Sequence, residues 1–177
     1  MFTIAPEPQD AALPIEGLLD RAFGISRHLK TAQRLRDGRL PAEGLAFIAH
    51  DSARILGTIR FWHVRAGDNT DALLLGPMAV EPWLNGQGIG SALIRHGLAQ
   101  AATLGHGAVV LVGDEPYYQR FGFRADAAKG LSLPGPFEQK RLLGVELAPG
   151  VLTQASGLVL PTGPQDPSTQ TVMQTAA

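Results

Sequence analysis

Three alternating glycines stand between an apolar run and an amphipathic run, in the segment "MAVEPWLNGQGIGSALIRHG" over residues 78–97. Gly86, Gly88 and Gly90 leave the backbone bare, and the residues that follow predict a helix over 88–104. The first N–H groups of a helix have no intrahelical partner and carry partial positive charge, so such an end binds anions, phosphates above all. The segment therefore predicts a pyrophosphate cradle, with a plain tight turn as the alternative. Its donors would be the N–H groups of Gly88, Ile89, Gly90 and Ser91, with the Ser91 hydroxyl as a further donor.

The spacing of the glycines argues against two other phosphate-binding loops. A nucleoside-triphosphate loop needs Gly-Lys-Ser/Thr after its first glycine, and no lysine is near. A dinucleotide-binding loop needs Gly-x-Gly-x-x-Gly, but the sixth position is Ser91 when counted from Gly86 and Leu93 when counted from Gly88. A nucleotide-binding oxidoreductase is therefore disfavoured.

The hydrophobic pattern predicts the elements that would position this loop. Strands are expected at residues 2–5, 44–51, 54–65, 71–80, 107–114 and 140–150, and helices at 8–24, 26–38, 88–104 and 116–123. Asp51, Ser52 and Ala53 would join two of the strands as a hairpin. The helix over 88–104 lies between two apolar strands, which should make those strands parallel neighbours. The order of elements predicts an α+β fold.

The predicted elements form one domain with a tail. Residues 1–159 are expected to be the domain, and residues 160–177, rich in Pro, Thr and Gln, a loosely ordered or disordered C-terminal segment. Leu13, Leu18, Leu19 and Phe23 would form the apolar face of the first helix, and Ile89, Leu93, Ile94, Leu98, Ala101 and Leu104 that of the helix after the glycines.

The composition argues against several classes of protein. The chain has 177 residues, a net charge of −1 and no basic block, so binding to nucleic acid or to a membrane surface has no electrostatic support. It has no cysteine, which excludes disulfides, thiolate metal sites and a cysteine nucleophile. The N-terminal residues do not resemble a signal peptide, and no apolar run reaches about 18 residues. A cytoplasmic protein is therefore expected.

Two motifs resemble those of a known family. The segments "LGPMAVEPWLNGQGIGSALI" and "VVLVGDEPYYQRFGF", separated by one predicted helix, are similar to those of the GNAT superfamily of acetyl-CoA-dependent N-acetyltransferases, and most similar to its small bacterial YhbS-like members. The motifs cover about residues 72–124. The order and length of the earlier elements extend the resemblance over residues 1 to about 150.

The resemblance implies a fold and an activity. The fold would be a mixed, mostly antiparallel central sheet flanked by helices, in which a parallel strand pair at about 72–80 and 108–112 splays apart. The activity would be transfer of an acetyl group from acetyl-CoA to a primary amine, by direct attack in a ternary complex and without a metal. The acceptor would be a small molecule or a peptide, and the family allows a homodimer. A non-catalytic module that senses CoA or acyl-CoA is the alternative.

The resemblance also implies which residues bind the cosubstrate. In the family, a segment Arg/Gln-x-x-Gly-x-Gly/Ala cups the CoA pyrophosphate, and here it becomes Asn85 to Gly90. Asn85 departs from the usual Arg or Gln, so a charge-assisted contact is lost while the backbone donors remain. The implied binding residues are Met78, Ala79, Val80, Asn85, Gly86, Gln87, Gly88, Ile89, Gly90, Ser91, Asp114 and Tyr118.

Two groups would act in catalysis. Tyr118 matches the family's Tyr-x-x-x-Gly-Phe, whose hydroxyl faces the CoA sulfur, and a phenol there can protonate the departing thiolate as general acid. Tyr117 is the alternative, and one of these adjacent tyrosines is expected to pack in the core, since neighbours on a helix point about 100° apart. The backbone at Met78–Val80 would bind the pantetheine arm and the acetyl carbonyl, with the Val80 N–H as oxyanion donor. Pro77 fits a splayed strand because it has no N–H for a ladder bond.

No residue is assigned as the base that takes the proton of the attacking amine. Asp71 and His63 lie on predicted strands, and Glu81, just past its strand, is expected to be solvated. His50, His96 and His106 are scattered without metal-ligand spacing, so no metal is expected.

The acceptor is not identified by the sequence. In the family its site is built from the segments that correspond here to "FGISRHLKTAQRLRDG" and "KGLSLPGPFEQK". The first of these contains five basic residues that could attract an anionic acceptor, although such a run is more often a solvated helix face. They are Arg27, His28, Lys30, Arg34 and Arg36.

Overall fold

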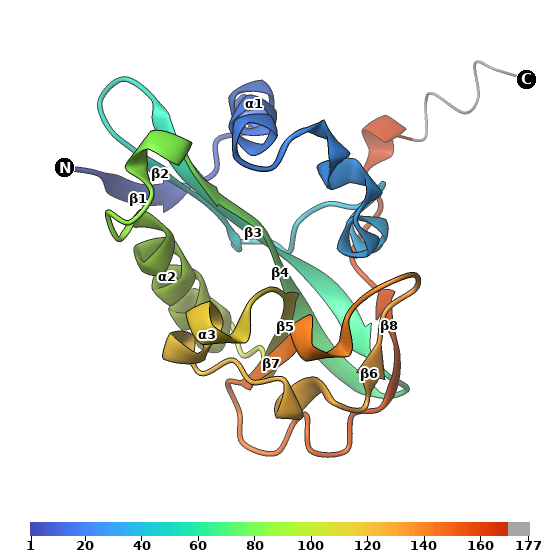
Figure 1. Cartoon of the computed structure of the whole chain (residues 1–177). Coiled ribbons are helices and arrows are strands. Elements are labelled where there is room, and N and C mark those ends of the chain that lie inside the picture. Colours follow the sequence, from blue (N-terminus) through green and yellow to red (C-terminus); the bar gives the residue numbers. More distant parts are fainter. Residues whose placement is uncertain (170–177) are drawn as a thin grey trace, which may run out of the picture.

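A mixed central sheet organises the chain, whose computed structural model describes residues 1–169 (Figure 1). The strands are β1 (Thr3–Pro6), β2 (Ala46–His50), β3 (Ile55–Ala66), β4 (Thr70–Val80), β5 (Ala108–Val112), β6 (Leu131–Ser132), β7 (Leu142–Glu146) and β8 (Gly157–Pro161). They confirm the expected α+β class and, within a few residues, the expected strands.

The helices are short except for two. They are α1 (Ala12–Phe23), α2 (Ile89–Thr103) and α3 (Glu115–Tyr118), with 3-10 turns η1 (Ile25–Leu29), η2 (Thr31–Leu35), η3 (Pro82–Leu84), η4 (Gln119–Phe121), η5 (Asp126–Ala128) and η6 (Gln139–Arg141). Within residues 1–169, no helix has the length and apolar character needed to cross a bilayer.

The sheet runs in the order β1-β2-β3-β4-β5-β7, and β8 pairs with both β3 and β6. Each neighbouring pair along the main path is antiparallel except β4 and β5, which are parallel. The helix α2 makes the crossover between these two strands, as a parallel connection requires. This confirms the expected mostly antiparallel sheet with one parallel pair.

The sheet is covered on both faces. On one face, α2 packs Leu93 and Ile94 in one cluster with Phe61 and with Leu73 and Leu75 of β4. On the other face, α1 lies over the end of β4 at Ala79, while η2 and β6 cover the even-numbered residues nearer its start. Figure 1 shows α1 and α2 on opposite sides of the sheet. Burial on both faces explains why β4 and β5 are apolar throughout rather than alternating.

Three details of the predicted helices are wrong. Residues 26–38 do not form one helix, because they are divided into η1 and η2 at Lys30, whose backbone is extended. In α1, Leu13 is 85% exposed and Phe23 40% exposed, and Ile15 takes the inward position. Leu104 is 48% exposed because α2 ends one residue earlier.

The expected start of a loose tail at residue 160 is also wrong. The strand β8 continues to Pro161 and pairs with Val64–Ala66 of β3. Beyond it, the carbonyl of Pro164 accepts the Leu40 N–H at 2.9 Å, and the Asp166 N–H donates to the Gly38 carbonyl at 2.9 Å. The sequence does not reveal this, because a five-residue strand followed by backbone hydrogen bonds needs no long apolar pattern. The remainder of the expected tail, residues 170–177, lies outside the described residues.

The contact between α2 and β3 generates a prediction about stability. A Cβ added at Gly97 would lie 2.4 Å from Cε2 of Phe61, which is fully buried. We expect Gly97→Ala to destabilise the fold by about 1–3 kcal/mol, the usual effect of overpacking. Chemical denaturation of both proteins measures this change.

The same exchange in α1 is the control. A Cβ at Gly17 would meet only the end of the flexible Arg21 side chain, at 3.2 Å. Gly17→Ala should therefore be neutral or stabilise by up to about 1 kcal/mol, through helix propensity. Equal effects of the two exchanges would show that α2 does not approach Phe61 as closely as described.

Candidate functional site

The strands β4 and β5 separate after a short paired segment. Their parallel ladder joins Leu73 with Val109 and Leu74 with Val110, and it ends there. On its other side, β4 stays paired with β3 up to Val80, after a bulge that sets Gly76 and Pro77 opposite Arg60. Within residues 1–169, the last part of β4 therefore has a partner strand on one edge only.

The hydrogen-bond alternation shows which groups face this open edge. The Glu81 N–H donates to the Leu56 carbonyl of β3 at 2.8 Å. Because successive residues of a strand direct their N–H and C=O groups to opposite edges, Val80 and Met78 direct theirs away from β3. Ala79 directs its backbone toward β3 by the same alternation. The open edge thus carries the N–H that the sequence predicts as oxyanion donor.

The three glycines of the loop have two different roles. Gly86 and Gly88 have φ angles of +81° and +84°, in the left-handed region that favours glycine. An added Cβ at either would meet no described atom within 4 Å, so the space beside them is open. Gly90 lies in the first turn of α2, where an added Cβ would be 3.2 Å from the Tyr117 hydroxyl. The first turn of α2 therefore presents its free N–H groups to an open space, as expected of a phosphate cradle.

A pocket of about 550 Å³ joins the end of β4 to this loop. Nine of the predicted cosubstrate residues line it, namely Met78, Ala79, Val80, Asn85, Gly86, Gly88, Ile89, Gly90 and Ser91. The other lining residues are Arg21, Ala22, Phe23, Pro82, Leu84, Tyr117 and Arg120. The predicted residues Gln87, Asp114 and Tyr118 lie outside this lining.

Two arginines of the pocket were not predicted as site residues. Arg120 donates from Nε to the Tyr117 carbonyl at 2.9 Å, and its Cζ lies 4.6 Å from the centre of the Tyr117 ring. Arg21 comes from the last turn of α1. Both arginines line the same pocket as Asn85, whose side chain carries no charge. Each looks like an ordinary surface charge in the sequence, and neither carries a signal that would have assigned it to the loop.

Glu81 is buried, not solvated as expected. Its side chain is 9% exposed, and its two carboxylate oxygens accept Nη2 of Arg21 at 2.6 Å and Nε at 3.2 Å. Both carboxylate oxygens of Glu81 are thus engaged by one guanidinium. Glu81 is therefore better explained as the group that positions Arg21 at the pocket than as a base.

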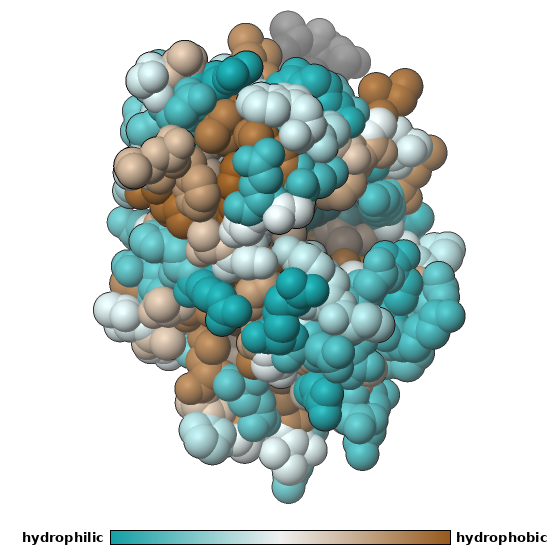
Figure 2. All heavy atoms as spheres, turned by 60° about the vertical axis from the view of Figure 1, so that its left-hand side comes forward, coloured by the Kyte–Doolittle hydropathy of each residue, from teal (hydrophilic) through white to brown (hydrophobic). Residues whose placement is uncertain are grey.

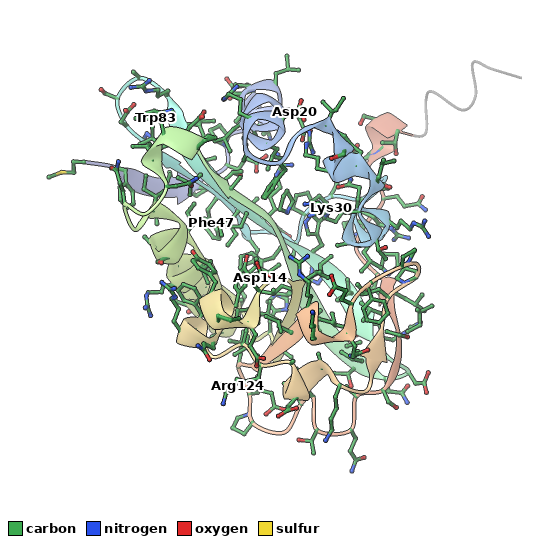
Figure 3. All side chains as sticks on the ribbon, in the orientation of Figure 1. Asp20, Lys30, Phe47, Trp83, Asp114 and Arg124 are labelled. Atoms are coloured by element: carbon green, nitrogen blue, oxygen red, sulfur yellow. The ribbon has the colours of Figure 1, made fainter. Side chains whose placement is uncertain are left out.

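Trp83 lies between the buried Glu81 and the glycine loop but faces away from the pocket. It is 57% exposed, and the guanidinium carbon of Arg54, at the β2–β3 hairpin, lies 4.7 Å from the centre of its ring (Figure 3).

On the molecular face that contains α2, hydrophilic side chains cover most of the surface and apolar ones form smaller areas between them (Figure 2).

The two adjacent tyrosines have different surroundings. Tyr117 lines the pocket and brings its hydroxyl to the first turn of α2. The Tyr118 ring lies against Gly113 at the end of β5, so closely that an added Cβ there would be 2.3 Å from Cε2. It also makes an edge contact with the buried Phe123, with ring centres 5.9 Å apart. Phe121 is only partly buried.

Burial changes the acidity of Tyr118. Removal from solvent, with smaller effects of Tyr117 and Asp114, raises the pKa of the Tyr118 phenol to about 12. The phenol is therefore protonated at neutral pH, which is the form that can donate a proton. Asp114, 76% exposed, lies 3.3 Å from Nε of Arg141.

The remaining candidate bases and histidines lie elsewhere in the structure, outside the lining of the first pocket. Asp71 is exposed at the start of β4. The rings of His63 and His106 are 5.4 Å apart, and His63 lines a second pocket of about 630 Å³ beside Leu40–Ala46. His96 packs against Phe47. In the described part of the chain, no three acidic or histidine side chains are grouped to hold a metal ion.

The basic segment after α1 is not a uniformly solvated face. Arg27 is 7% exposed and pairs with Glu16 and Asp20. Lys30 lies 4.8 Å from the centre of the Phe23 ring, and Arg34 donates from Nη1 to the Pro134 carbonyl at 2.8 Å. This segment thus contacts both α1 and the loop after β6.

Comparisons with known proteins agree with this arrangement. A family model described as "Acetyltransferase (GNAT) domain" matches residues 42–125. The uncharacterised N-acetyltransferase YhbS of Escherichia coli K12 is 30% identical over 146 residues, which cover 82% of this chain and 87% of YhbS. The uncharacterised N-acetyltransferase YjhQ of the same strain is 29% identical over 143 residues, covering 78% of this chain and 79% of YjhQ.

Two solved structures of similar proteins contain the cosubstrate or its product. YhbS from Escherichia coli in complex with CoA has a TM-score of 0.77 and 30% identity, covering 91% of this chain and 89% of that one. A GNAT family acetyltransferase from Brucella melitensis in complex with acetyl-CoA has a TM-score of 0.64 and 26% identity, covering 94% of both chains. The splayed strands, the glycine loop and these similarities lead to one conclusion: the chain belongs to the GNAT family of acetyltransferases.

Proposed function

We propose that this protein transfers an acetyl group from acetyl-CoA to a primary amine by direct attack in a ternary complex. The observation that carries the proposal is the continuity of one pocket from the open edge of β4 to the first turn of α2. A ligand with a phosphate at one end and a carbonyl at the other fits these two groups of donors. Acetyl-CoA is such a ligand.

The glycine loop would bind the pyrophosphate. The free N–H groups of Ile89, Gly90 and Ser91 are oriented by the helix, and Gly86 and Gly88 keep the approach clear. Arg120 would add positive charge that Asn85 does not provide, and Arg21, whose charge is paired with Glu81, would add N–H donors. Acetyl-CoA itself would supply the activated acetyl group and the thiolate leaving group.

The open edge of β4 would hold the pantetheine arm and the acetyl group. An extended arm can take the place of the missing neighbour strand and bind backbone groups of Met78 and Val80. When the amine nitrogen attacks the acetyl carbon, the carbonyl oxygen becomes an oxyanion, and the Val80 N–H is the proposed donor to it. One such donor typically lowers the barrier by about 3–4 kcal/mol.

Tyr118 would complete the reaction. As the carbon–sulfur bond breaks, the phenol proton passes to the sulfur, so that CoA leaves as a thiol and not as a thiolate. The position of Tyr118 against the end of β5, across the opening from β4, supports this role. The amine gives up its own proton to a group that we do not assign.

Isothermal titration with acetyl-CoA, followed by thiol release with a panel of amines, tests the proposal as a whole. Micromolar binding and amine-dependent thiol release are expected. A non-catalytic CoA sensor would bind without thiol release, whereas a nucleotide-binding oxidoreductase would bind NADH in preference to acetyl-CoA.

The first specific prediction concerns the cradle. Gly90→Glu places a carboxylate at the first turn of α2, where we propose the pyrophosphate, so acetyl-CoA should bind roughly 100-fold more weakly or worse. Ala99→Glu adds the same charge at an exposed position of the same helix and should leave the dissociation constant unchanged. Calorimetry measures both. Wild-type affinity of a folded Gly90→Glu protein would place the phosphates elsewhere.

The second specific prediction concerns the general acid. Tyr118→Phe keeps the ring and removes the proton donor, so turnover should fall by about 10²-fold, the low end for general acids because a thiolate leaves readily. The dissociation constant of acetyl-CoA should change little. Because the pKa of Tyr118 is raised to about 12, its proton stays in place and turnover should not decline up to about pH 10. Steady-state kinetics across this range measure both effects.

Tyr117→Phe is the matched control. Its hydroxyl lies beside Gly90, so its loss should weaken acetyl-CoA binding a few-fold and leave turnover nearly unchanged. Normal turnover of Tyr118→Phe, with chemistry rate-limiting, would instead assign the proton to Tyr117 or to water.

A further inference from the structure

Three arginines lie between α1, η2 and β3, and only two of them are neutralised. Arg27 pairs with Asp20 and Glu16, at 2.8 and 2.5 Å. Arg60 pairs with Glu7 through two hydrogen bonds of 2.7 and 2.6 Å. Arg36 forms no ion pair within residues 1–169. Its recorded partner is the side-chain carbonyl of Gln33, 2.9 Å from Nη2.

The unpaired charge of Arg36 is largely removed from solvent. Its Nε is buried without an acceptor among the described residues. Burial lowers the pKa of Arg36 to about 10, with Arg27 and Arg60 acting in the same direction and Asp37 and Glu16 in the opposite one. Arg36 is therefore still charged at neutral pH. A cation in this setting is costly unless something negative compensates it.

The nearest acid along the chain is already engaged. Asp37 accepts the side-chain N–H of Gln33 at 2.6 Å, so the Gln33 amide stands between this carboxylate and Arg36. Glu16, the other acid that raises the pKa of Arg36, is paired with Arg27. The protein thus provides a charged guanidinium without giving it a carboxylate.

The guanidinium lies at the opening between β4 and β5. An added Cβ at Gly76 would be 3.4 Å from Nη1 of Arg36. Gly76 is two residues beyond Leu74, the last residue paired with β5, and two residues before Met78, the first of the proposed acetyl-binding groups. The Gly76 carbonyl accepts its hydrogen bond from the Trp62 indole N–H and not from the Arg36 guanidinium.

Arg36 reaches this opening from the face opposite the glycine loop. Leu35 of η2 packs with Trp62 and Leu74 on one face of the sheet, and α2 packs on the other. Lys30, between η1 and η2, and Asp20, on α1, mark the side of Arg36 in Figure 3. An acceptor bound on the same side as Arg36 would contact this guanidinium. Its amine would then reach the acetyl group through the opening between β4 and β5.

We propose that Arg36 binds a carboxylate of the acceptor, so that the substrates of this protein are amines that also carry a carboxylate group. The inference rests on the proposed acetyltransferase function and names its substrate class. A guanidinium is the side chain best suited to a carboxylate, because its N–H donors match the two carboxylate oxygens. The bound carboxylate would supply the negative charge that Asp37 and Glu16 do not.

The test compares acceptors in matched pairs, each an amino acid and the amine that has the same skeleton without the carboxylate. Thiol release from acetyl-CoA gives kcat/KM for both members. We expect the wild-type protein to favour the carboxylate-bearing member by roughly 10- to 100-fold, the effect of one charge-assisted contact. Arg36→Gln should remove most of this preference through a higher KM for that member.

Two further variants separate binding from folding. Arg36→Lys keeps the charge without the planar fork and should retain part of the preference. Arg65→Gln removes the same charge from an exposed residue of β3, outside the basic segment, and should keep the full preference. A preference that survives in a folded Arg36→Gln protein, or a wild-type protein that ignores the carboxylate, overturns the inference.

The failure of the proposed function would look different. Absence of acetyl-CoA binding, or of thiol release with every amine of either kind, would overturn the acetyltransferase proposal and this inference with it. Acetyl transfer only to amines without a carboxylate would leave the acetyltransferase proposal intact. It would refute only the assignment of Arg36.

Discussion

The open edge of β4 beyond Leu74 is the constraint on which the rest of the site depends. A buried backbone N–H or C=O without a partner is costly, so strands in the middle of a sheet are normally paired on both sides. Here the bulge at Gly76 and Pro77 keeps β4 paired with β3 while it separates from β5. The alternation set by the Glu81–Leu56 hydrogen bond then directs Val80 into the opening. The protein maintains a row of unsatisfied groups that a ligand can complete.

The charge that a phosphate ligand needs comes from outside the loop. The loop contributes conformational freedom and N–H groups, while Arg21 arrives from α1 and Arg120 from η4. Both guanidiniums are held by hydrogen bonds, one to the buried Glu81 and the other to the Tyr117 carbonyl. A fixed cation loses less side-chain entropy when a phosphate binds than a free one does. Arg120 can thus supply charge that Asn85 lacks, while Glu81, which pairs with Arg21, fixes the remaining N–H groups of Arg21 at the pocket.

The sequence predicted the parts of this structure that depend on local pattern. The parallel strand pair and the glycine turn before α2 follow from local pattern and were predicted correctly. The pyrophosphate cradle stays a prediction. The burial of Glu81 and the presence of Arg21 at the pocket were missed, because each depends on a partner 60 residues away. The division at Lys30 and the docking of residues 160–166 were missed for a related reason. They are determined by tertiary hydrogen bonds, which leave no periodicity in the sequence.

The two faces of the sheet would contribute different groups to the proposed reaction. In the proposal, CoA contacts β4, the glycine loop and α2, together with Arg21 of α1 and Arg120 of η4, whereas Arg36 comes from the end of η2 on the face opposite α2. On the face of η1 and η2, Arg36 is a positive charge near the opening that no ion pair within residues 1–169 neutralises. Such a charge lowers the pKa of an amine placed beside it, because it disfavours the ammonium form. An acceptor held by its carboxylate at Arg36 would shield part of this charge, so the distance between its carboxylate and its amine sets how easily the nitrogen is deprotonated. Under this proposal, the length of the acceptor, and not only its charge, would be a determinant of rate.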